Sequence, residues 1–166
     1  MSRASSSHRP EPHRARPSPA ALRATARRRA REWVIQGLYE FFVARNAPEE
    51  ILGRLGSPRA SPGTLDFMRQ LWQGVHRERE ALERAVASFL DRAWTEVSPV
   101  ERAIVLLGCY ELMHCRETPW RVVLNEAIEL AKRYGGTDGH KWVNGVLDRF
   151  AAQVRAEEVA QSRSFG

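Results

Sequence analysis

The sequence predicts an all-α protein of about seven helices, and two observations support this prediction. Apolar residues recur at spacings of three and four along most of the chain, which is the period of one buried helix face. No stretch shows the period-two alternation, bounded by turn residues, that is typical of a strand. A chain of 166 residues is long enough to bury a sizeable core, so we expect one helical domain over residues 25–156.

The chain begins with a basic tail, residues 1–24, for which we predict disorder because Ser, Pro and Arg leave little to bury. Residues 1–31 hold nine arginines against the single acid Glu11, a net charge of +8 in a chain whose total is +6. Such an arm usually contacts a polyanion, nucleic acid above all. A membrane surface is the weaker alternative, because the arm has no apolar face to insert.

The first helix is predicted from Thr25 to Arg45. Its apolar stripe consists of Ala30, Val34, Leu38, Phe41 and Phe42. A short second helix is expected in NAPEEILGRLG, where Pro48 suits the first turn and Gly56 ends the helix. SPRASPG is a loop, and a third helix starts at Thr64. We expect a break or bend in that third helix near HRERE, residues 76–80, before its stripe continues to Leu90.

The segment SPVERAIVLLGCYELMHC is predicted to be the central helix, because its interior is apolar almost all round. Ser98 is its expected N-cap, Pro99 its first residue and Glu101 the capping-box partner. Cys109 and Cys115 lie six residues apart on different faces of this helix, so we expect two buried thiols rather than a disulfide. That pattern fits a reducing cytoplasm.

Two more helices complete the predicted domain. One follows Pro119 and stops at Gly135, with cations in its last turn. The last begins in TDGHKWVNG, capped by Thr137 or Asp138, and residues 157–166 are left as a C-terminal tail. The longest apolar run is far shorter than the ~20 residues that a membrane helix needs, and no apolar segment follows the N-terminal charges as in a secretory signal. We therefore expect a cytoplasmic protein.

The sequence offers little for catalysis. His76, His114 and His140 fall on three separate helices without metal-ligand spacing, so a zinc site is not expected. Without strands there is no phosphate loop of the strand–loop–helix type. Glu126 and Glu129 lie on one helix face, where a solvated face or a local ion pair is the commoner explanation. We predict no enzyme activity, no metal, no cofactor and no small-molecule substrate.

Four arginines at the start of the first helix are the main binding candidates: Arg27, Arg28, Arg29 and Arg31. Cations are unfavourable at a helix N-terminus, and such local conflicts often mark functional sites. A solvated, frayed helix end is the alternative. At 100° per residue Tyr39 shares a flank with Arg28, and basic groups beside an aromatic ring suit single-stranded RNA. Tyr39 is as readily explained as a structural residue.

A second candidate is the helix start in DGHKWVNG. Free backbone N–H groups there, with Lys141 in the first turn, can hold an anion. Trp142 is either a core residue or a stacking surface, and Asn144 either caps the helix or bonds a base edge.

Four stretches together resemble the NusB family of transcription antitermination factors: ARRRAREWVIQGLYE, VERAIVLLGCYEL, NEAIELAKRYGG and HKWVNGVLDR. They occur in the family's order and spacing, over residues 26–155. The resemblance implies two small packed helical bundles. It also implies binding of the single-stranded boxA element of ribosomal RNA leader transcripts, in a heterodimer with the small-subunit ribosomal protein NusE. The pair would join other Nus factors on RNA polymerase.

The resemblance also assigns residues to two surfaces. The implied RNA surface comprises Arg27, Arg28, Arg29, Arg31, Tyr39, Asp138, Lys141 and Trp142. The implied ribosomal-protein surface comprises Phe89, Glu96, Glu101 and Arg102. The family commonly has phenylalanine at the position of Trp142, which also stacks, and often tyrosine at Phe89, whose hydroxyl is lost here.

Two other functions share these features. One is a helical protein–protein adaptor whose basic tail is non-specific. The other is the NusB-like domain of an rRNA cytosine methyltransferase, which would require this chain to be a fragment. Salt dependence separates an adaptor from an RNA binder, because each phosphate contact on a single strand contributes a log–log slope of roughly −0.7.

Overall fold

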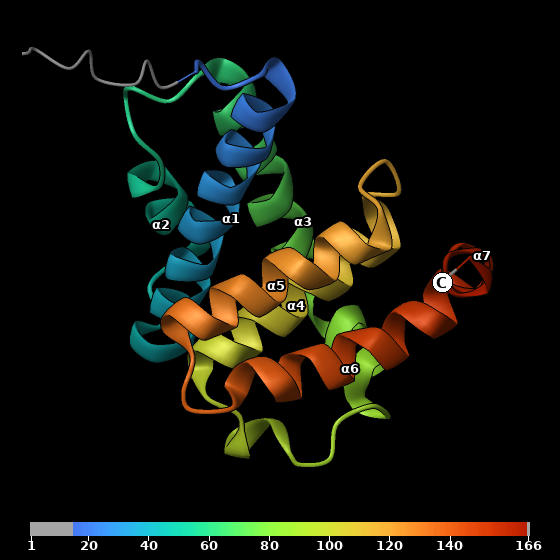
Figure 1. Ribbon diagram of the computed structural model, residues 1–166. Helices are drawn as coiled ribbons and strands as arrows, with labels where there is room; N and C mark the ends of the chain where they lie inside the picture. The colour runs from blue at the N-terminus through green and yellow to red at the C-terminus, as the bar shows by residue number, and fades with distance from the viewer. Residues whose placement is uncertain (1–14, 166) are drawn as a thin grey trace, which may run out of the picture.

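A computed structural model describes residues 15–165, and within this range the protein is all-α, as predicted. Seven α-helices and one short 3₁₀ helix follow each other along the chain (Figure 1). Their bounds are α1 Pro19–Ala44, α2 Pro48–Arg54, α3 Pro62–Ala87, the 3₁₀ helix η1 Trp94–Glu96, α4 Pro99–His114, α5 Trp120–Tyr134, α6 Gly139–Val154 and α7 Ala156–Ser164.

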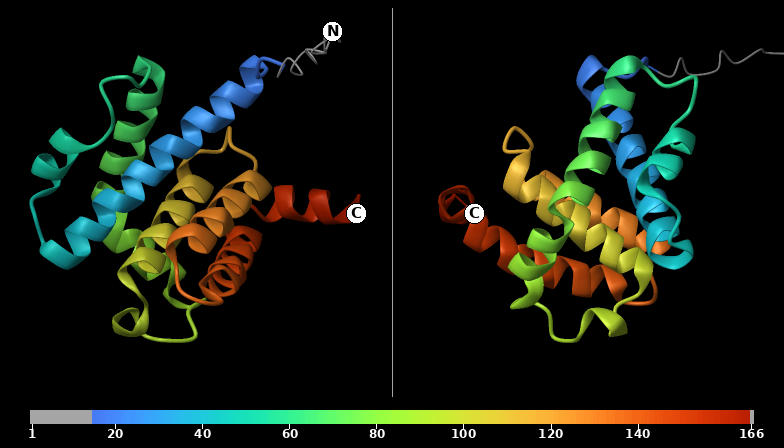
Figure 2. Two further views of the ribbon diagram at one scale, coloured as in Figure 1. Left: turned by 60° about the vertical axis from the view of Figure 1, so that its left-hand side comes forward. Right: turned by 180° about the vertical axis from the view of Figure 1, so that it is seen from behind.

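The helices form two packed groups around α4. Helices α1, α2 and α3 make one group, α4, α5 and α6 make the other, and α4 also packs against both α1 and α3 (Figures 1 and 2). Every residue of α4 from 103 to 112 is buried, which confirms its predicted place at the centre. Helix α7 extends from the end of α6, on the side of the molecule away from α2.

At both ends of α4, side chains form hydrogen bonds with the backbone. At its start the Ser98 hydroxyl accepts a hydrogen bond from the Glu101 N–H at 3.2 Å and donates one to the Glu101 carboxylate at 2.5 Å. The predicted N-cap Ser98 and first-turn Pro99 are therefore confirmed, whereas the Glu101 carboxylate bonds to the Ser98 hydroxyl instead of the Ser98 backbone N–H that a capping box requires. At its other end the buried Arg155 guanidinium donates to the carbonyls of Glu111, Leu112 and Cys115 at 2.8–2.9 Å. The Glu111 and Cys115 carbonyls also accept backbone hydrogen bonds, from the Cys115 and Thr118 N–H groups, so Arg155 adds a second donor to each and supplies one to Leu112 in the last turn.

Helix α1 begins six residues earlier than predicted. Ser18 is its N-cap, accepting a hydrogen bond from the Ala21 N–H at 3.1 Å, and Pro19 occupies the first turn. The prediction of disorder was therefore wrong for residues 19–24. Those residues are exposed, so the apolar periodicity used for the prediction does not reach them. Residues 1–14 of the predicted tail lie outside the described part of the chain.

Helix α3 is continuous through the predicted break at residues 76–80. The charged stretch stays helical because it forms ion pairs along one face, such as Arg79 with Glu83 at 3.6 Å. Gly74 lies so close to α4 that a Cβ atom there would be 2.1 Å from the Tyr110 ring. The two helices therefore approach each other closely in the middle of α3.

Helix α7 occupies most of the segment predicted to be a C-terminal tail. Val159 is buried, and the Glu158 carboxylate accepts hydrogen bonds from the Trp120 N–H and from Arg155. These contacts are made with other helices, so the sequence of α7 alone did not reveal them. Cys109 and Cys115 are free and buried, as expected. No helix in residues 15–165 is long and apolar enough to cross a membrane.

Candidate nucleic-acid interface

The four arginines near the start of α1 point in different directions, because consecutive helical residues are rotated by 100°. Arg27 stacks over the Phe67 ring of α3, with its guanidinium carbon 4.4 Å from the ring centre. Arg29 lies on the opposite flank over Trp33, at 5.4 Å. Only Arg28 faces α5. The predicted basic cluster is thus spread around the helix rather than gathered on one face.

Arg31 is a structural residue. Its side chain and that of Glu111 are each 3% exposed, and the guanidinium binds the carboxylate through three hydrogen bonds of 2.8–3.1 Å. Burial lowers the pKa of Arg31, but the charge and hydrogen bonds of Glu111 outweigh it, so the pKa is raised and the cation is retained. The burial of Arg31 and its bonds to Glu111 through Nε and Nη2 argue against the expected contact with RNA.

Arg28 is exposed but already paired. Its Nε and Nη2 atoms donate to the two carboxylate oxygens of Glu126 on α5 at 3.0 and 2.9 Å, which raises the pKa of Arg28. A second ion pair, Arg133 with Glu32, joins the same two helices one turn further along α1. Half or more of each arginine side chain remains accessible, 49% and 60%. Both guanidiniums can therefore offer donors to an incoming phosphate.

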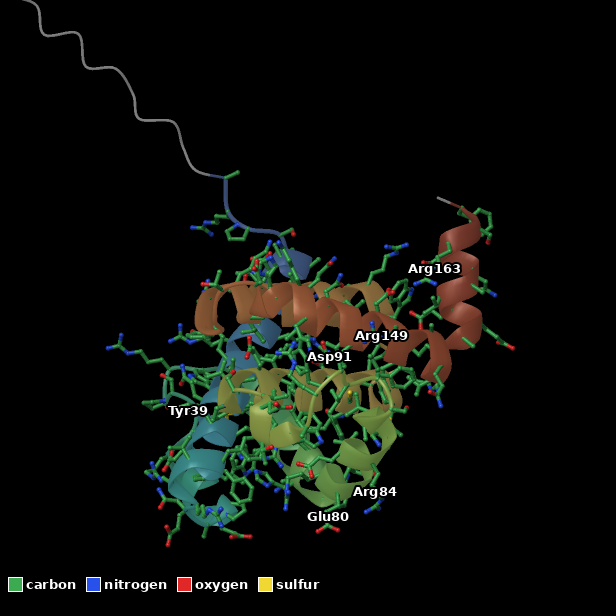
Figure 3. The ribbon with its side chains drawn as sticks, turned by 90° about the horizontal axis from the view of Figure 1, so that it is seen from below. Tyr39, Glu80, Arg84, Asp91, Arg149 and Arg163 are labelled. Atoms are coloured by element: carbon green, nitrogen blue, oxygen red, sulfur yellow. The ribbon has the colours of Figure 1, made fainter. Side chains whose placement is uncertain are left out.

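Tyr39 lies on the same face of α1, about 16 Å from Arg28 along the helix axis at 1.5 Å per residue. Its side chain is 45% exposed and lines an apolar hollow of 190 Å³ together with Ile35, Val100 and the half-exposed Tyr134. Figure 3 shows Tyr39 at the side of the molecule opposite Arg163 of α7. The hollow therefore presents two tyrosines at the junction of α1, α4 and α5.

Arg133 and Tyr134 were missed as site residues by the sequence. In the sequence, Arg133 is explained equally well as a cation that stabilises the C-terminal, negative end of the α5 dipole. Only the packing of α5 beside α1 brings Arg133 to Glu32 and Tyr134 to Tyr39.

The start of α6 adds a cation to this region. Asp138 is the N-cap residue, as predicted, but its φ of 63° is left-handed and its side chain makes no capping hydrogen bond. Instead its carboxylate pairs with Lys141 Nζ at 3.2 Å, and both side chains are about two-thirds exposed or more, 67% and 72%. The ammonium group of Lys141 is thus available at the surface.

Trp142 has a mixed role. Its ring is half-buried, its Nε1–H donates to Asp91 at 2.9 Å, and Arg92 lies over the ring at 5.3 Å. The hydrogen bonds from Arg92 and then from Trp142 lower the pKa of Asp91 to about 2. The indole is therefore held in place by Asp91 rather than presented as a free stacking surface.

The four residues assigned to the protein surface make different contacts. Phe89 packs edge-on against Phe150 at 5.9 Å, and the Glu96 carboxylate caps η1 by accepting from the Ala93 N–H at 3.1 Å. Glu101 lies against Gly139 of α6, where a Cβ atom would be only 1.9 Å from its Oε1. Arg102 turns the other way, pairing with Glu83 of α3 at 2.5 Å. Glu101 and Arg102 therefore belong to different sides of α4.

The described residues contain no group of three or more His, Cys, Asp or Glu side chains placed to hold a metal ion. Burial raises the pKa of the Cys115 thiol to about 12, so this thiol is not poised as a nucleophile. The chemistry that the surface offers is that of recognition: an aromatic hollow with the exposed cation Arg133 beside Tyr134, and Arg28 further along the same face of α1.

Comparisons of sequence and of structure with known proteins all match one protein family. The sequence model described as the NusB family matches residues 28–152. A transcription antitermination protein NusB from Ralstonia nicotianae is 49% identical over 149 residues, covering 87% of this chain and 94% of that protein. One from Thiobacillus denitrificans is 43% identical, covering 84% and 97%. Among solved structures, NusB of T. maritima superposes with a TM-score of 0.74 at 30% identity, covering 80% of this chain and 95% of that one.

Proposed function

The chain belongs to the NusB family of transcription antitermination proteins, and from this premise we propose that it binds the single-stranded boxA element of ribosomal RNA leader transcripts. It would do so in a heterodimer with the small-subunit ribosomal protein NusE, as part of a Nus complex on RNA polymerase. The RNA surface consists of the exposed cations Arg28, Arg133 and Lys141 around the Tyr39–Tyr134 hollow. Arg27, Arg29, Asp138 and Trp142 lie at its margins, and Arg31 is excluded.

The observation that carries this proposal is the apolar hollow between Tyr39 and Tyr134 beside exposed guanidiniums. Single-stranded RNA is recognised by stacking unpaired bases on aromatic rings while cations contact the phosphates. The Arg28–Glu126 and Arg133–Glu32 pairs hold both guanidiniums in place without burying them. A phosphate can then share or take over the donors that now face a carboxylate.

The test is fluorescence anisotropy with a labelled boxA-like RNA and a scrambled RNA of equal length. The protein is titrated alone and with NusE, and the variants are Arg28→Ala, Tyr39→Ala and Lys141→Ala. We expect each variant to weaken boxA binding roughly tenfold, since one base stack or one charge-assisted contact is worth about 1–3 kcal/mol. Arg69→Ala is the matched control, because Arg69 is equally exposed on α3 and pairs only with its neighbour Asp66.

The protein-partner surface is tested in the same assay. NusE is expected to sharpen the preference for boxA over the scrambled RNA, and Phe89→Ala or Glu101→Ala should remove that gain while leaving binding without NusE intact. Equal affinity for the two RNAs in every condition would reject the boxA proposal. It would leave the alternative of a helical adaptor with a non-specific basic tail.

A further inference from the structure

A second basic site lies at the other end of α1, outside the surface proposed for RNA. A hollow of 330 Å³ is lined there by residues from α1, its C-cap, α3 and α4: Phe41, Phe42, Arg45, Arg79 and Arg102. Three of the five lining residues are arginines. Of these, only Arg102 appeared among the residues expected to contact a protein partner.

Two of the guanidiniums are held in place by aromatic rings. Arg102 lies over the Phe42 ring at 4.3 Å, and Arg79 lies over the Phe41 ring at 5.6 Å. Both rings are partly buried and packed against the core. Stacking of this kind fixes the plane of a guanidinium while its N–H groups remain free to donate within that plane. The donors are therefore preorganised before any ligand arrives.

The positive charge of the hollow is only partly neutralised. Glu83 is the one carboxylate paired with the lining arginines within residues 15–165: its Oε1 lies 2.5 Å from Arg102 Nη2 and 3.6 Å from Arg79 Nη1. Arg45 forms no ion pair in that part of the chain. Arg102 Nε is buried without an acceptor. Three cations against one anion leave donors that an external anion can satisfy.

Arg45 is also held in an unfavourable backbone conformation. It ends α1 with a φ of 57°, in the left-handed region that glycine or asparagine usually occupies at this position. A non-glycine residue there costs free energy, and such strain is concentrated at functional sites. The conformation places the Arg45 side chain at the edge of the hollow.

The hollow does not continue the RNA surface. At 100° per residue Arg45 lies about 120° around the α1 axis from Tyr39, so a strand over Arg28 and Tyr39 would have to wrap the helix to reach it. Guanidiniums already lie over one face of each phenylalanine ring, and Phe41 also packs against His76, which reduces the ring surface open to a base. On its other side Arg102 also approaches Trp94 of η1, at 5.5 Å. The hollow therefore borders the loop that carries Glu96.

We propose that this hollow binds an acidic segment of a protein partner. Carboxylates of Asp or Glu would accept hydrogen bonds from Arg45, Arg79 and the accessible part of the Arg102 guanidinium, displacing or sharing Glu83. Arginine is suited to this because its fork of donors matches a carboxylate with two parallel hydrogen bonds. The proposal does not depend on boxA recognition, and it adds a contact on a different face of the protein.

The experiment uses the full chain and a fluorescein-labelled octaglutamate peptide, with octaglutamine as the uncharged probe. Binding is followed by anisotropy in the wild type and in Arg45→Gln, Arg79→Gln and the double variant. The control is Arg69→Gln/Arg84→Gln, which removes two exposed charges of α3 away from the hollow. We expect the double variant to bind octaglutamate at least tenfold more weakly, and the control to bind within about twofold of wild type.

The outcomes distinguish an acidic peptide from RNA as the ligand of the hollow. Loss of octaglutamate binding in Arg45→Gln/Arg79→Gln, with boxA-like RNA binding unchanged, supports the proposal whether or not the RNA is selected over a scrambled one. A parallel loss of RNA affinity would overturn it and assign the hollow to RNA. Equal octaglutamate binding by wild type, variant and control, or no binding at all, would also overturn it. Arg45 is exposed and contributes little to the core, so Arg45→Gln alone keeps the test valid if Arg79→Gln unfolds.

Discussion

The buried pair of Arg31 and Glu111 shows how residues of one type take different roles within five positions. Arg28, three residues earlier, keeps half of its side chain in solvent, whereas Arg31 is 3% exposed and joins α1 to α4. A buried charge is tolerated only while its partner is present, because an unpaired carboxylate in the interior is strongly disfavoured. Arg31 is therefore expected to affect stability and not RNA affinity.

We predict that Arg31→Ala lowers the free energy of unfolding by about 3–5 kcal/mol, because it leaves the Glu111 charge buried and alone. Urea denaturation followed by circular dichroism measures this. Arg31→Met/Glu111→Leu removes both charges and should recover most of the loss while binding boxA-like RNA as the wild type does. An RNA affinity that falls in this stable double variant would contradict the structural role of Arg31.

His76 makes stability depend on pH. It packs against Phe41 and Trp72, and burial, followed by the charge of Arg79, lowers its pKa to about 4, despite a small opposing effect of Glu49. The unfolded chain binds a proton near pH 6.5, so it holds more protons than the folded one between pH 4 and 6.5. The His76 contribution is fully present above pH 6.5 and is lost as pH falls through that window.

The predicted result is that the urea midpoint falls from pH 7 to pH 4.5 more steeply in the wild type than in His76→Leu, which has no proton to gain. Identical pH profiles would show that the pKa of His76 does not change on folding, which would contradict this prediction. His114, which is exposed and pairs with Glu78 at 3.6 Å, serves as the control position through His114→Gln.

At the scale of elements, the central helix α4 is fixed from three sides: its cap at Ser98, the close approach of α3 at Gly74 and the guanidinium of Arg155. The approach of α3 depends on the absence of a side chain at Gly74, because a Cβ atom there would meet the Tyr110 ring. The arrangement of the two helix groups therefore depends on a few contacts with little tolerance.

Gly74→Ala is expected to destabilise the protein by about 1–3 kcal/mol through this clash, even though alanine is the better helix former. Gly53→Ala is the matched substitution, since it lies in α2 with nothing within 4 Å of the added atom. It should be neutral or stabilising by a few tenths of a kcal/mol. Thermal unfolding of the two variants compares these effects, and equal melting temperatures would contradict the packing argument.

Arg155→Ala should cost about 3 kcal/mol or more, because it removes the buried hydrogen bonds from the guanidinium to the carbonyls of Glu111, Leu112, Cys115 and Thr118. Arg155→Lys should recover only part, since one ammonium cannot reach all of them. Arg149→Ala provides the control, because Arg149 is exposed and donates to a single carbonyl, that of Phe89. Chemical denaturation measures the free energy of unfolding of the three variants. A loss of stability in Arg149→Ala equal to that in Arg155→Ala would refute the argument.

Most element types, but not all their limits, could be predicted from the sequence. Helices α4 and α5 were placed within a residue or two, because Ser98–Pro99, Pro119 and Gly135 are local signals. The extension of α1 and all of α7 were missed, because the first is exposed and the second is held by contacts with α5 and Arg155. Of the expected site residues, Arg28, Tyr39 and Lys141 are exposed, whereas the burial of Arg31 and the position of Tyr134 depend on tertiary packing that the sequence does not reveal.

At the scale of the whole molecule, charge is divided between a nearly neutral helical body and a basic N-terminal segment. The body carries its exposed cations on separate faces, one beside Tyr39 and one at the end of α1. Arg3, Arg9, Arg14 and Arg16 precede the first helix. Cations of this kind contact phosphates without reading bases, so they add affinity but not selectivity.

Deleting residues 1–17 is expected to lower the affinity for boxA-like and scrambled RNA by the same factor. The slope of log affinity against log salt should become shallower by roughly 0.7 for each phosphate contact that is lost. Anisotropy titrations at four salt concentrations give both quantities. A deletion that changes the ratio of the two affinities would mean that these residues take part in sequence recognition.

The position of Arg155 has a consequence for synthesis. The family match ends at residue 152, and every buried residue of α4 is made long before Arg155 is. A nascent chain made only up to residue 152 thus already contains the residues of its central helix, yet the carbonyls at the end of that helix still lack the Arg155 guanidinium. Translation must add only three more residues to change this. The final turn of α4 is therefore completed by a residue 40 positions after Cys115, so chains cut short near residue 152 are expected to be targets for proteolysis.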